Sequence, residues 1–310
     1  MKHAIIIHNP VSEYSKEDEL DVLDQAKLIE KELPGLGYDS IRMDFNLNIQ
    51  LLMNEIKAKN PSIIFNLVET VNEKGKLSFI APAVLDTSGF RYTGSGPEAI
   101  YTTTDKLLCK TILCNNNINT PDWARNLSEI ISSKTYLFKP IAEDGSVGIE
   151  DNILYKGDQI SEIPKDYFVE EYIDGREFNI SLIGGTVLPP AEMCFFNYSP
   201  NKPKILGYKS KWEESSFEYK NTERNFNFEE KDFSLLKELK SITKRCWHLF
   251  NLKGYARVDF RVGIDNIPRV IEINANPCIA PDSGFVAACH QAGLTNAEII
   301  KRIIEDAERN

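Results

Sequence analysis

The chain contains 310 residues, of which 42% are hydrophobic and 26% are charged, and it carries a formal net charge of −10. This length suits two or three small domains that share a core, and the acidic balance argues against general binding of nucleic acid. No apolar run approaches the ~20 residues that cross a bilayer, and the apolar stretch near the N-terminus is too short for a signal peptide, so we expect a cytoplasmic protein with no membrane attachment.

Strand and helix patterns alternate in the first third of the chain. Short apolar runs typical of strands occupy residues 4–8, 40–45 and 62–68, and a helical pattern occupies residues 49–59. A longer helix is expected to begin near Ser15, with Asp18 completing a weak capping box, and to end at Pro34-Gly35. Strand–helix alternation predicts a parallel sheet with helices on both faces. We therefore expect an N-terminal α/β domain over residues 1–95.

The middle of the chain has a different pattern. After one expected helix over residues 98–115, turns rich in Gly and Asp separate strand patterns typical of antiparallel hairpins. These strands are expected at residues 135–139, 152–156, 167–173 and 177–184. Residues 199–227 are polar, aromatic and without periodicity, which predicts a long loop of the kind that often forms a lid. We assign residues 96–175 to a small lid domain.

The last third predicts a further α+β domain over residues 176–310. A helix is expected over 232–250, and two strands over 255–262 and 269–274. The closing helix is marked by a capping box of Thr295 and Glu298 ahead of an isoleucine stripe.

The two strands of this last third place charged side chains together. Side chains alternate between the faces of a strand, so Arg257 and Asp259 share one face, together with Tyr255 and Arg261, and apolar residues take the other. If Asp265-Asn266 forms a tight turn, the numbers of cross-strand partners sum to 531. Asp259 then lies opposite Glu272, and Arg257 lies opposite Asn274. The same register places Val270 on the side of Glu272.

Opposed carboxylates repel each other unless a cation neutralises them. A hard divalent cation does so, and two carboxylates with one amide oxygen form a ligand set that suits magnesium. The alternative is that Arg257 and Arg261 pair with these acids in a solvated network. The spacing alone leaves both interpretations open.

Arg257-Val-Asp259, followed by Glu272-Ile-Asn274-Ala-Asn-Pro277, resembles the magnesium-binding end of ATP-grasp enzymes, and most closely that of the D-alanine–D-alanine ligase family. The resemblance extends over nearly the whole chain. It implies an N-terminal parallel α/β domain, an antiparallel lid domain and a C-terminal α+β domain, with ATP between the last two. It also implies two Mg²⁺ ions, with Mn²⁺ as the alternative, on Asp259, Glu272 and Asn274.

The resemblance assigns two lysines, a glycine-rich loop, a hinge strand with its ribose-binding acid and a lid lysine to ATP. Backbone N–H groups in such a loop approach the phosphates without interference from side chains, and a lid lysine reaches the phosphates while the lid excludes water. The residues assigned to ATP are Lys106, Lys139, Gly145, Ser146, Val147, Gly148, Glu170, Glu171, Tyr172, Ile173, Glu177 and Lys211.

The activity implied is an ATP-dependent carboxylate–amine ligase that makes an amide or peptide bond through an acyl phosphate. Catalytic roles are implied for Arg257, Lys211 and Ser146. Arg257 and a backbone N–H near Cys278 would stabilise the tetrahedral intermediate. The implied substrates are small amino acids or peptides, and a homodimer is the assembly that the family suggests.

The residues expected to contact the substrates are Glu13, Glu69, Glu73, Arg257, Cys278, Asp282 and Ser283. Several depart from the family pattern. Glu69 stands where the family has His, Cys278 where it has Gly, and Gly145 and Trp212 replace a Ser and a Tyr that belong to one hydrogen-bonded group. The extra carboxylates of Glu69 and Asp282 favour a more amine-rich substrate than two alanines.

Two other hypotheses remain at this point. One is a true D-alanine–D-alanine ligase of cell-wall synthesis. The other, from a different class, is a non-catalytic ATP-binding sensor or scaffold. Retention of Lys139, Lys211, Arg257 and the three expected metal ligands argues against the second.

Overall fold

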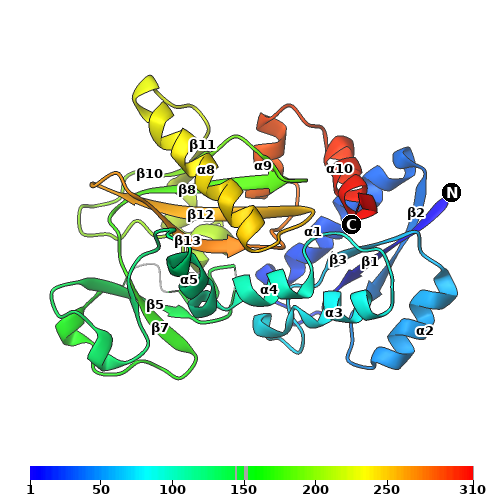
Figure 1. Cartoon of the computed structure of the whole chain (residues 1–310), viewed down its shortest axis with the longest axis horizontal. Coiled ribbons are helices and arrows are strands. Elements are labelled where there is room, and N and C mark those ends of the chain that lie inside the picture. The colour runs from blue at the N-terminus through cyan, green and yellow to red at the C-terminus, as the bar shows by residue number, and fades with distance from the viewer. Residues whose placement is uncertain (144, 150–152, 310) are drawn as a thin grey trace.

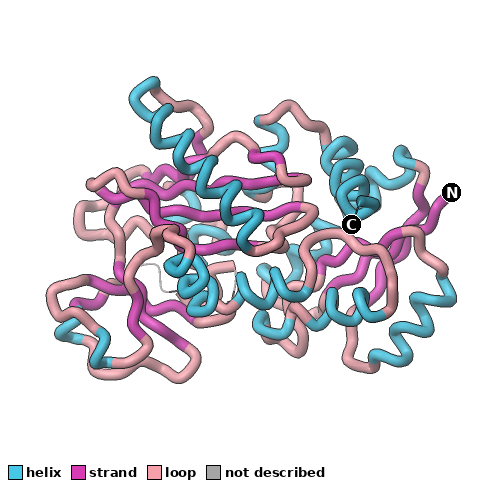
Figure 2. Tube along the Cα trace, viewed as in Figure 1, coloured by secondary structure: helices cyan, strands magenta, loops and turns pink. Residues whose placement is uncertain are grey.

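The computed structural model describes residues 1–143, 145–149 and 153–309, and within them the longer strands form three sheets. In Figure 1 the sheet of β1, β2 and β3 lies near the N-terminus, and the sheets that contain β5 and β12 lie at the other end of the molecule. Helices cover the sheets and loops join them, as coloured in Figure 2. Among the described residues, no helix is long and apolar enough to cross a membrane.

The first sheet is parallel and has the strand order β2-β1-β3. Its strands and covering helices are β1 (Lys2–His8), α1 (Glu17–Glu32), β2 (Tyr38–Asp44), α2 (Ile49–Lys59), β3 (Ile63–Leu67) and α3 (Ile80–Thr87). Ile5 and Ile7 of β1 pack with residues of α2 and α3, whereas Ala4 and Ile6 pack with residues of α1 and of α10 (Asn296–Arg309). A central parallel strand is thus buried on both faces, and the predicted parallel sheet is confirmed.

The N-cap of α1 is Lys16, one residue later than the predicted N-cap, Ser15. The backbone N–H of Lys16 donates to Glu19 Oε2 at 2.8 Å, and Glu17 is the first helical residue. Ser15 Oγ instead accepts a bond from the N–H of Ser12 at 3.1 Å. The predicted capping box of Ser15 and Asp18 is therefore wrong, because the side chain of Ser15 is engaged in the preceding turn.

The single helix predicted over residues 98–115 is in fact two helices, α4 (Pro97–Thr104) and α5 (Lys106–Asn115). Asp105 separates them with ψ 99°, outside the helical region, and its side chain accepts bonds from the N–H groups of Leu107 and Leu108. An aspartate N-cap thus starts the second helix. Apolar residues of both helices belong to the core under the third sheet.

The second sheet is antiparallel, as predicted, with the order β4-β7-β5-β6. Its strands are β4 (Trp123–Ala124), β5 (Thr135–Pro140), β6 (Tyr155–Lys156) and β7 (Tyr167–Glu171). The strand predicted over residues 152–156 is described only from residue 153, and β6 covers its last two residues.

The third sheet has the order β11-β10-β8-β12-β13, and β9 pairs with β8 outside this path. Its strands and neighbouring helices are β8 (Gly175–Ile183), β9 (Thr186–Val187), β10 (Ala191–Phe195), β11 (Thr222–Asn225), α8 (Phe233–Leu249), β12 (Tyr255–Gly263), β13 (Pro268–Asn274) and α9 (Gly284–Gln291). Phe178 and Ile180 of β8, with Val258 and Phe260 of β12, pack with residues of α8. The alternate positions on these strands face away from α8 and remain for polar side chains.

The segment over residues 199–227 is more regular than the long loop that its sequence predicts. It contains the short helices α6 (Tyr208–Trp212) and α7 (Phe217–Lys220) and the edge strand β11, which pairs with β10. Elements of four or five residues are too short to show a hydrophobic period. The closing helix α10 is as predicted, since the N–H of Thr295 donates to Glu298 Oε2 and the N–H of Glu298 donates to Thr295 Oγ1.

Gly254 at the start of β12 provides a test of the fold. Its φ is +65°, and a Cβ there would lie 2.8 Å from the backbone N and Cα of Gly94. We expect Gly254→Ala to lower the free energy of unfolding by about 2 kcal/mol or more, because left-handed backbone strain and a clash add together. Chemical denaturation measures the change.

Gly35→Ala is the matched control, because a Cβ at Gly35 meets no atom within 4 Å. We expect this variant to stay within about 0.5 kcal/mol of the parent protein. Equal denaturation midpoints for the two variants would contradict the assignment of strain to Gly254.

Candidate active site

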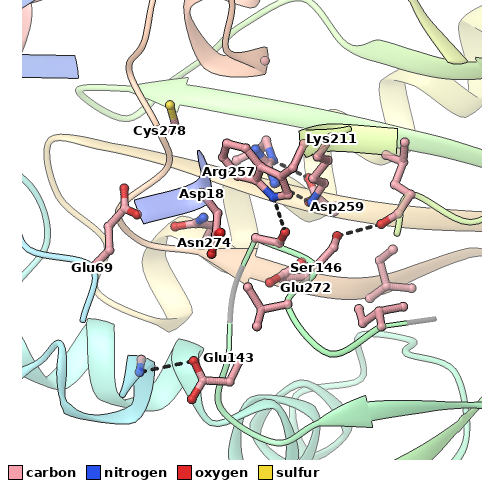
Figure 3. A pocket seen from close by; sticks show the side chains of 18 of the residues that line it. Asp18, Glu69, Glu143, Ser146, Lys211, Arg257, Asp259, Glu272, Asn274 and Cys278 are labelled. Atoms are coloured by element: carbon pink, nitrogen blue, oxygen red, sulfur yellow. Dashed lines mark hydrogen bonds and ion pairs between the residues drawn. The ribbon is translucent and has the colours of Figure 1, made fainter. Parts of the chain in front are cut away.

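A cavity of about 930 Å³ opens among the three sheets. Helix α1 and the segment after β3 line it from the first sheet, β5 and β7 from the second, and β8, β12 and β13 from the third. Figure 3 shows Arg257 and Asp259 close to Lys211, whereas Glu69 projects from a separate segment of the chain. The charged residues predicted from the two ends of the sequence therefore share one cavity.

The hairpin of β12 and β13 has the predicted ligand register but not the predicted turn. Asp259 pairs with Glu272 and Arg257 with Asn274, as predicted. Beyond a bulge that leaves Ile271 unpaired, Phe260 pairs with Val270 and the partner numbers sum to 530 instead of 531. The bulge also turns Val270 into the core beside Ile273, so our prediction that Val270 faces the same way as Glu272 is wrong.

The hairpin loop is longer than the predicted tight turn at Asp265-Asn266. The N–H of Asn266 donates to the carbonyl of Gly263 at 3.0 Å, and Asn266 has φ +56°. Residues 264–267 join the two strands, and a type I turn followed by a left-handed residue is a common way to connect a hairpin that lacks a two-residue turn. The loop shifts the pairing of the two strands by one residue from the predicted register, and the bulge shifts it back by one. Asp259 therefore still faces Glu272.

Each predicted metal ligand already has a polar partner. Both carboxylate oxygens of Asp259 accept bonds from Arg257, at 2.8 Å each. Glu272 Oε1 lies 3.7 Å from Lys106 Nζ, and Asn274 Oδ1 accepts the N–H of Asn276 at 2.9 Å. The pairing of Arg257 with Asp259 matches the solvated-network interpretation in part.

The donor set nevertheless fits a hard divalent cation. Asp259, Glu272 and Asn274 present three oxygen-bearing side chains from adjacent strands to one cavity. A carboxylate or amide oxygen has two lone pairs, so the bonds to Arg257 and to the Asn276 backbone leave acceptor capacity toward the cavity. Among the described residues there is no cluster of three or more His, Cys, Asp or Glu that could hold a metal.

The glycine-rich loop is described except for residue 144. Gly145 and Ser146 have φ +67° and +65°, so two successive residues adopt left-handed conformations. Ser146 Oγ donates to the carbonyl of Leu206 at 2.7 Å, and Trp212 Nε1 donates to the carbonyl of Gly145 at 2.9 Å. The two replaced positions, 145 and 212, therefore bond to each other and connect the loop to α6.

Helix α6 is also attached to α1. Tyr208 Oη donates to Asp18 Oδ1 at 2.9 Å. Burial, and then the bond to Asp18, raise the pKa of Tyr208 to about 12, so the phenol remains the donor at neutral pH. This contact and the one between Trp212 and Gly145 hold α6 over the cavity.

A buried charge cluster lies where the second sheet borders the cavity. Glu170 is 2% exposed, and its carboxylate forms ion pairs with Lys139 Nζ and with Lys110 Nζ at 2.6 Å each. Lys110 also donates to Thr120 Oγ1 at 2.7 Å. Burial opposes ionisation of Glu170, but the two ammonium groups lower its pKa overall. We did not predict Lys110, whose position on α5 gives no sequence signal beyond a lysine among apolar residues.

Glu177, another acid assigned to ATP, is also paired. Glu177 is 4% exposed and lies 3.4 Å from Arg261 Nε. Burial raises the pKa of Glu177, and Arg261 opposes the shift. Among the described residues, no ion pair joins Lys211 to a carboxylate within 4 Å. Burial, and then repulsion from Arg257, lower the pKa of Lys211.

The end of the cavity beside α1 contains a group of hydrogen-bonded side chains that we did not predict. Gln25 Nε2 donates to Glu69 Oε1 at 2.8 Å and to Asp21 Oδ2 at 3.2 Å. Cys278 Sγ donates to the same Asp21 oxygen at 2.8 Å. Burial raises the pKa of Asp21. Asp21 and Gln25 lie on α1, far in sequence from Glu69 and Cys278, so only the fold shows that they meet.

Most of the predicted site residues line this one cavity. Lys106 is buried, is not among the lining residues and donates to the carbonyl of Glu143 at 2.5 Å. Gly148 and Glu13 are exposed and are not part of the lining. The predicted residues that line the cavity are Glu69, Glu73, Lys139, Gly145, Ser146, Val147, Glu170, Glu171, Tyr172, Ile173, Glu177, Lys211, Arg257, Asp259, Glu272, Asn274, Cys278, Asp282 and Ser283.

One parallel sheet is followed along the chain by two antiparallel sheets, and lysines and a glycine-rich loop line the cavity beside the last two. This arrangement defines the class of ATP-grasp enzymes. The model of the family described as D-ala D-ala ligase C-terminus matches residues 120–305, and the chain belongs to that family. It is an ATP-dependent carboxylate–amine ligase.

Proteins similar to this chain cover most of its length. An uncharacterized protein, y4sG, of Sinorhizobium fredii is 28% identical over 264 residues, which are 81% of this chain and 76% of that protein. The D-alanine--D-alanine ligase of Aquifex aeolicus is 27% identical over 295 residues, 91% of this chain and 94% of that enzyme. The crystal structure of D-alanine--D-alanine ligase from Bacillus anthracis complexed with ATP superimposes with a TM-score of 0.73 at 20% identity, covering 100% of this chain and 98% of that one.

The lowered pKa of Lys211 predicts the pH dependence of ATP use. The ammonium group of Lys211 loses its proton as the pH rises through this pKa, which lies below the ordinary value of 10.5. Its attraction for phosphate therefore weakens at a pH below 10.5, and the pH profile of the reaction should show an alkaline limb there. The neighbouring charges are Arg257, which lowers the pKa, and Asp259, Glu272 and Glu177, which raise it. We expect kcat/KM for ATP, measured by ADP release at saturating Mg²⁺, to fall along this limb.

Lys211→Arg is the matched variant, because a guanidinium stays protonated across this range. Its alkaline limb is expected at higher pH, even if its maximal rate is lower. A limb at the same pH in both proteins would assign the titration to another group.

Proposed function

We propose that Asp259, Glu272 and Asn274 hold Mg²⁺ and that ATP lies in the cavity between the second and third sheets. Lys139 and Lys211 are the ammonium groups nearest to its phosphates, and the backbone of the Gly145–Ser146 turn approaches them closely. When bound, the metal neutralises negative charge on the phosphates. Three oxygen ligands on adjacent strands, facing the same cavity as these lysines, are the observation that carries the proposal.

The reaction follows from this arrangement. A carboxylate oxygen of the first substrate attacks the γ-phosphorus of ATP, the bond from that phosphorus to ADP breaks, and an acyl phosphate forms. The nitrogen of the second substrate then attacks the carbonyl carbon and loses a proton, and phosphate leaves. The protein contributes mainly positioning and charge stabilisation.

Arg257 is positioned to stabilise the anionic tetrahedral intermediate. Asp259 holds its guanidinium through two bonds of 2.8 Å, which fixes the orientation of the remaining N–H groups. The backbone N–H of Cys278 is the second proposed donor. Ser146 has a positioning role, since its hydroxyl holds the loop to Leu206, and α6 excludes water from the acyl phosphate.

We further propose that the substrate with the reacting carboxylate bears an ammonium group that contacts Asp21 and Glu69. One amide nitrogen of Gln25 bonds to both carboxylates, so the two acids lie close together beside Cys278. Glu13, which we expected to contact a substrate, is exposed and is not part of the cavity lining. Glu73 lines the same end, and an amino acid with an additional amine suits this acidic environment.

A D-alanine–D-alanine ligase is the second candidate function, favoured by the relatives that bear this name. A non-catalytic sensor is disfavoured, because the ATP lysines, Arg257 and the proposed metal ligands are all present. We propose the divisions 1–95, 96–175 and 176–310 as domains, with α4 and α5 packed on the third, and a homodimer as the assembly.

Glu272→Gln tests the metal site. The amide removes one anionic ligand, so the Mg²⁺ concentration that gives half-maximal ADP release is expected to rise about tenfold or more. Glu69→Gln is the matched control, because Glu69 lies on another segment of the cavity, and its Mg²⁺ midpoint should remain unchanged at saturating substrates. A Glu272→Gln midpoint equal to that of the parent protein would remove Glu272 from the ligand set.

A panel of amino-acid pairs tests the substrate proposal. We expect ADP release to be faster with a pair that includes a diamino acid than with D-alanine alone, because Asp21 and Glu69 attract a second ammonium group. In Glu69→Gln this advantage is expected to fall by about tenfold, the value of one charged hydrogen bond. Efficient turnover of D-alanine alone to the dipeptide would support the second candidate instead.

A further inference from the structure

A buried amide side chain beside the cavity joins three segments of the chain. Gln25, on α1, is 2% exposed and is not among the residues that line the cavity. Its Nε2 donates to Asp21 Oδ2 at 3.2 Å and to Glu69 Oε1 at 2.8 Å, and its Oε1 accepts the backbone N–H of Ile279 at 3.2 Å. One side chain thus connects α1, the segment after β3 and the segment after β13.

The surroundings of Gln25 make these bonds costly to lose. Val22 and Ala26 of the same helix belong to the apolar core that also contains Ile279. A buried polar group that loses its partner destabilises a protein by about 1–3 kcal/mol. Ionised carboxylates only accept hydrogen bonds and a backbone N–H only donates them. A single orientation of the Gln25 amide therefore satisfies all three partners, and the side chain is fixed in that orientation.

Helix α1 holds the segment around Cys278 through two hydrogen bonds. Cys278 Sγ donates to Asp21 Oδ2 at 2.8 Å, and it accepts the N–H of Ala280 at 3.2 Å. The following peptide is held by the bond from the N–H of Ile279 to Gln25. Asp21 and Gln25 lie one turn apart on the same face of α1, so both side chains reach the same segment.

The backbone N–H of Cys278 is thereby held in place as a donor. Within the part of the chain that the structure describes, this N–H makes no hydrogen bond, and Cys278 lines the cavity. A donor stabilises a developing oxyanion best when its direction is fixed before the reaction begins. Here the direction is fixed by the side chain of Cys278 itself and by the peptide that follows it, both of which are bonded to α1.

We propose that Gln25 is a positioning residue for amide formation, which holds the Cys278 peptide toward the tetrahedral intermediate and joins it to the two acids that contact the first substrate. This inference rests on the proposed ligase function. Gln25 acts through Asp21, Glu69 and the backbone after Cys278, and it does not itself line the cavity. Loss of Gln25 should therefore affect the second chemical step more than the first.

The two chemical steps distinguish this role from a general loss of structure. Attack of the first substrate's carboxylate on the γ-phosphorus releases ADP and places no new charge on the carbonyl oxygen. Attack of the amine on the carbonyl carbon does place a charge there, so only this step uses the donor at Cys278. Rapid quenching of a single turnover measures both steps, as ADP and as amide, with the amino-acid pair that releases most ADP in the panel.

Gln25→Leu removes the amide group and keeps a similar volume. At saturating substrates and Mg²⁺ we expect the rate of amide formation to fall about tenfold or more, because the N–H of Ile279 loses its acceptor and the Cys278 peptide is no longer held in place. The rate of ADP formation in the first turnover should change less than about threefold. A protein that is merely destabilised would lose both rates together.

Two further variants sharpen the comparison. Gln25→Glu keeps an acceptor for the N–H of Ile279, and a proton shared with Asp21 or Glu69 replaces one N–H donor, because acids held close together share protons. This variant should restore amide formation to within about threefold of the parent rate. Gln50→Leu makes the same change as Gln25→Leu on the exposed surface of α2 and should leave both rates unchanged.

Three results would overturn the proposal. They are an unchanged rate of amide formation in Gln25→Leu, equal losses of ADP and amide formation in that variant, and equally slow amide formation in Gln25→Leu and Gln25→Glu.

Hydrogen exchange separates this inference from the ligase proposal, because it needs no turnover. Exchange is followed by mass spectrometry on peptides that contain Ile279, with peptides from β1 as the internal control. We expect exchange at Ile279 to be about tenfold faster or more in Gln25→Leu and close to the parent rate in Gln25→Glu, with β1 unchanged in both. Equal exchange in the parent protein and Gln25→Leu overturns the positioning role. Failure of the parent protein to form an amide from any pair contradicts the ligase proposal instead.

Discussion

The alternation of side chains along β8 and β12 is the constraint on which the rest of the structure depends. Apolar residues of both strands, such as Ile180 and Val258, pack with α8, while the intervening residues Glu177, Arg257 and Asp259 face the cavity. A slip of one residue would bury the charged set and expose the apolar set. The hydrophobic core therefore holds the charged groups in register, and the position of the site follows from packing on the opposite face.

The charges on the cavity face are arranged largely as pairs. Asp259 pairs with Arg257, Glu177 with Arg261, and Glu170 with both Lys139 and Lys110. Removal of one partner of a buried pair leaves a charge that costs about 3–5 kcal/mol. The double pairing of Glu170 limits this cost, because Lys110 stays beside the carboxylate if the contact with Lys139 is broken. Lys211 lies at the other extreme, because no ion pair with a carboxylate holds it among the described residues.

The sequence predicts the regular parts of this molecule and misses contacts between distant segments. Long elements with a clear period, such as α2 and α10, were predicted within a few residues, and alternation placed Asp259 opposite Glu272. The break at Asp105 was missed because the helical pattern continues across it, although an aspartate ahead of Lys106-Leu107-Leu108 is a possible N-cap. Counting residues outward from the predicted turn does not reveal the bulge at Ile271. Asp21 and Gln25 were missed because α1 reaches the cavity only after folding, and the expected role of Glu13 depended on a loop that lies elsewhere.

The bulge at Ile271 determines which insertions and deletions the hairpin can tolerate during evolution. It separates the register of the ligands from the register of the loop, where Ile264 is fully exposed. A change in loop length near Ile264 can be absorbed at the tip without moving Asp259 relative to Glu272. Loss of Ile271 itself would force either the ligands or the core residue Val270 onto the wrong face. We therefore expect drift in length to collect at the tip of this hairpin, while the bulge persists wherever the ligand pair does.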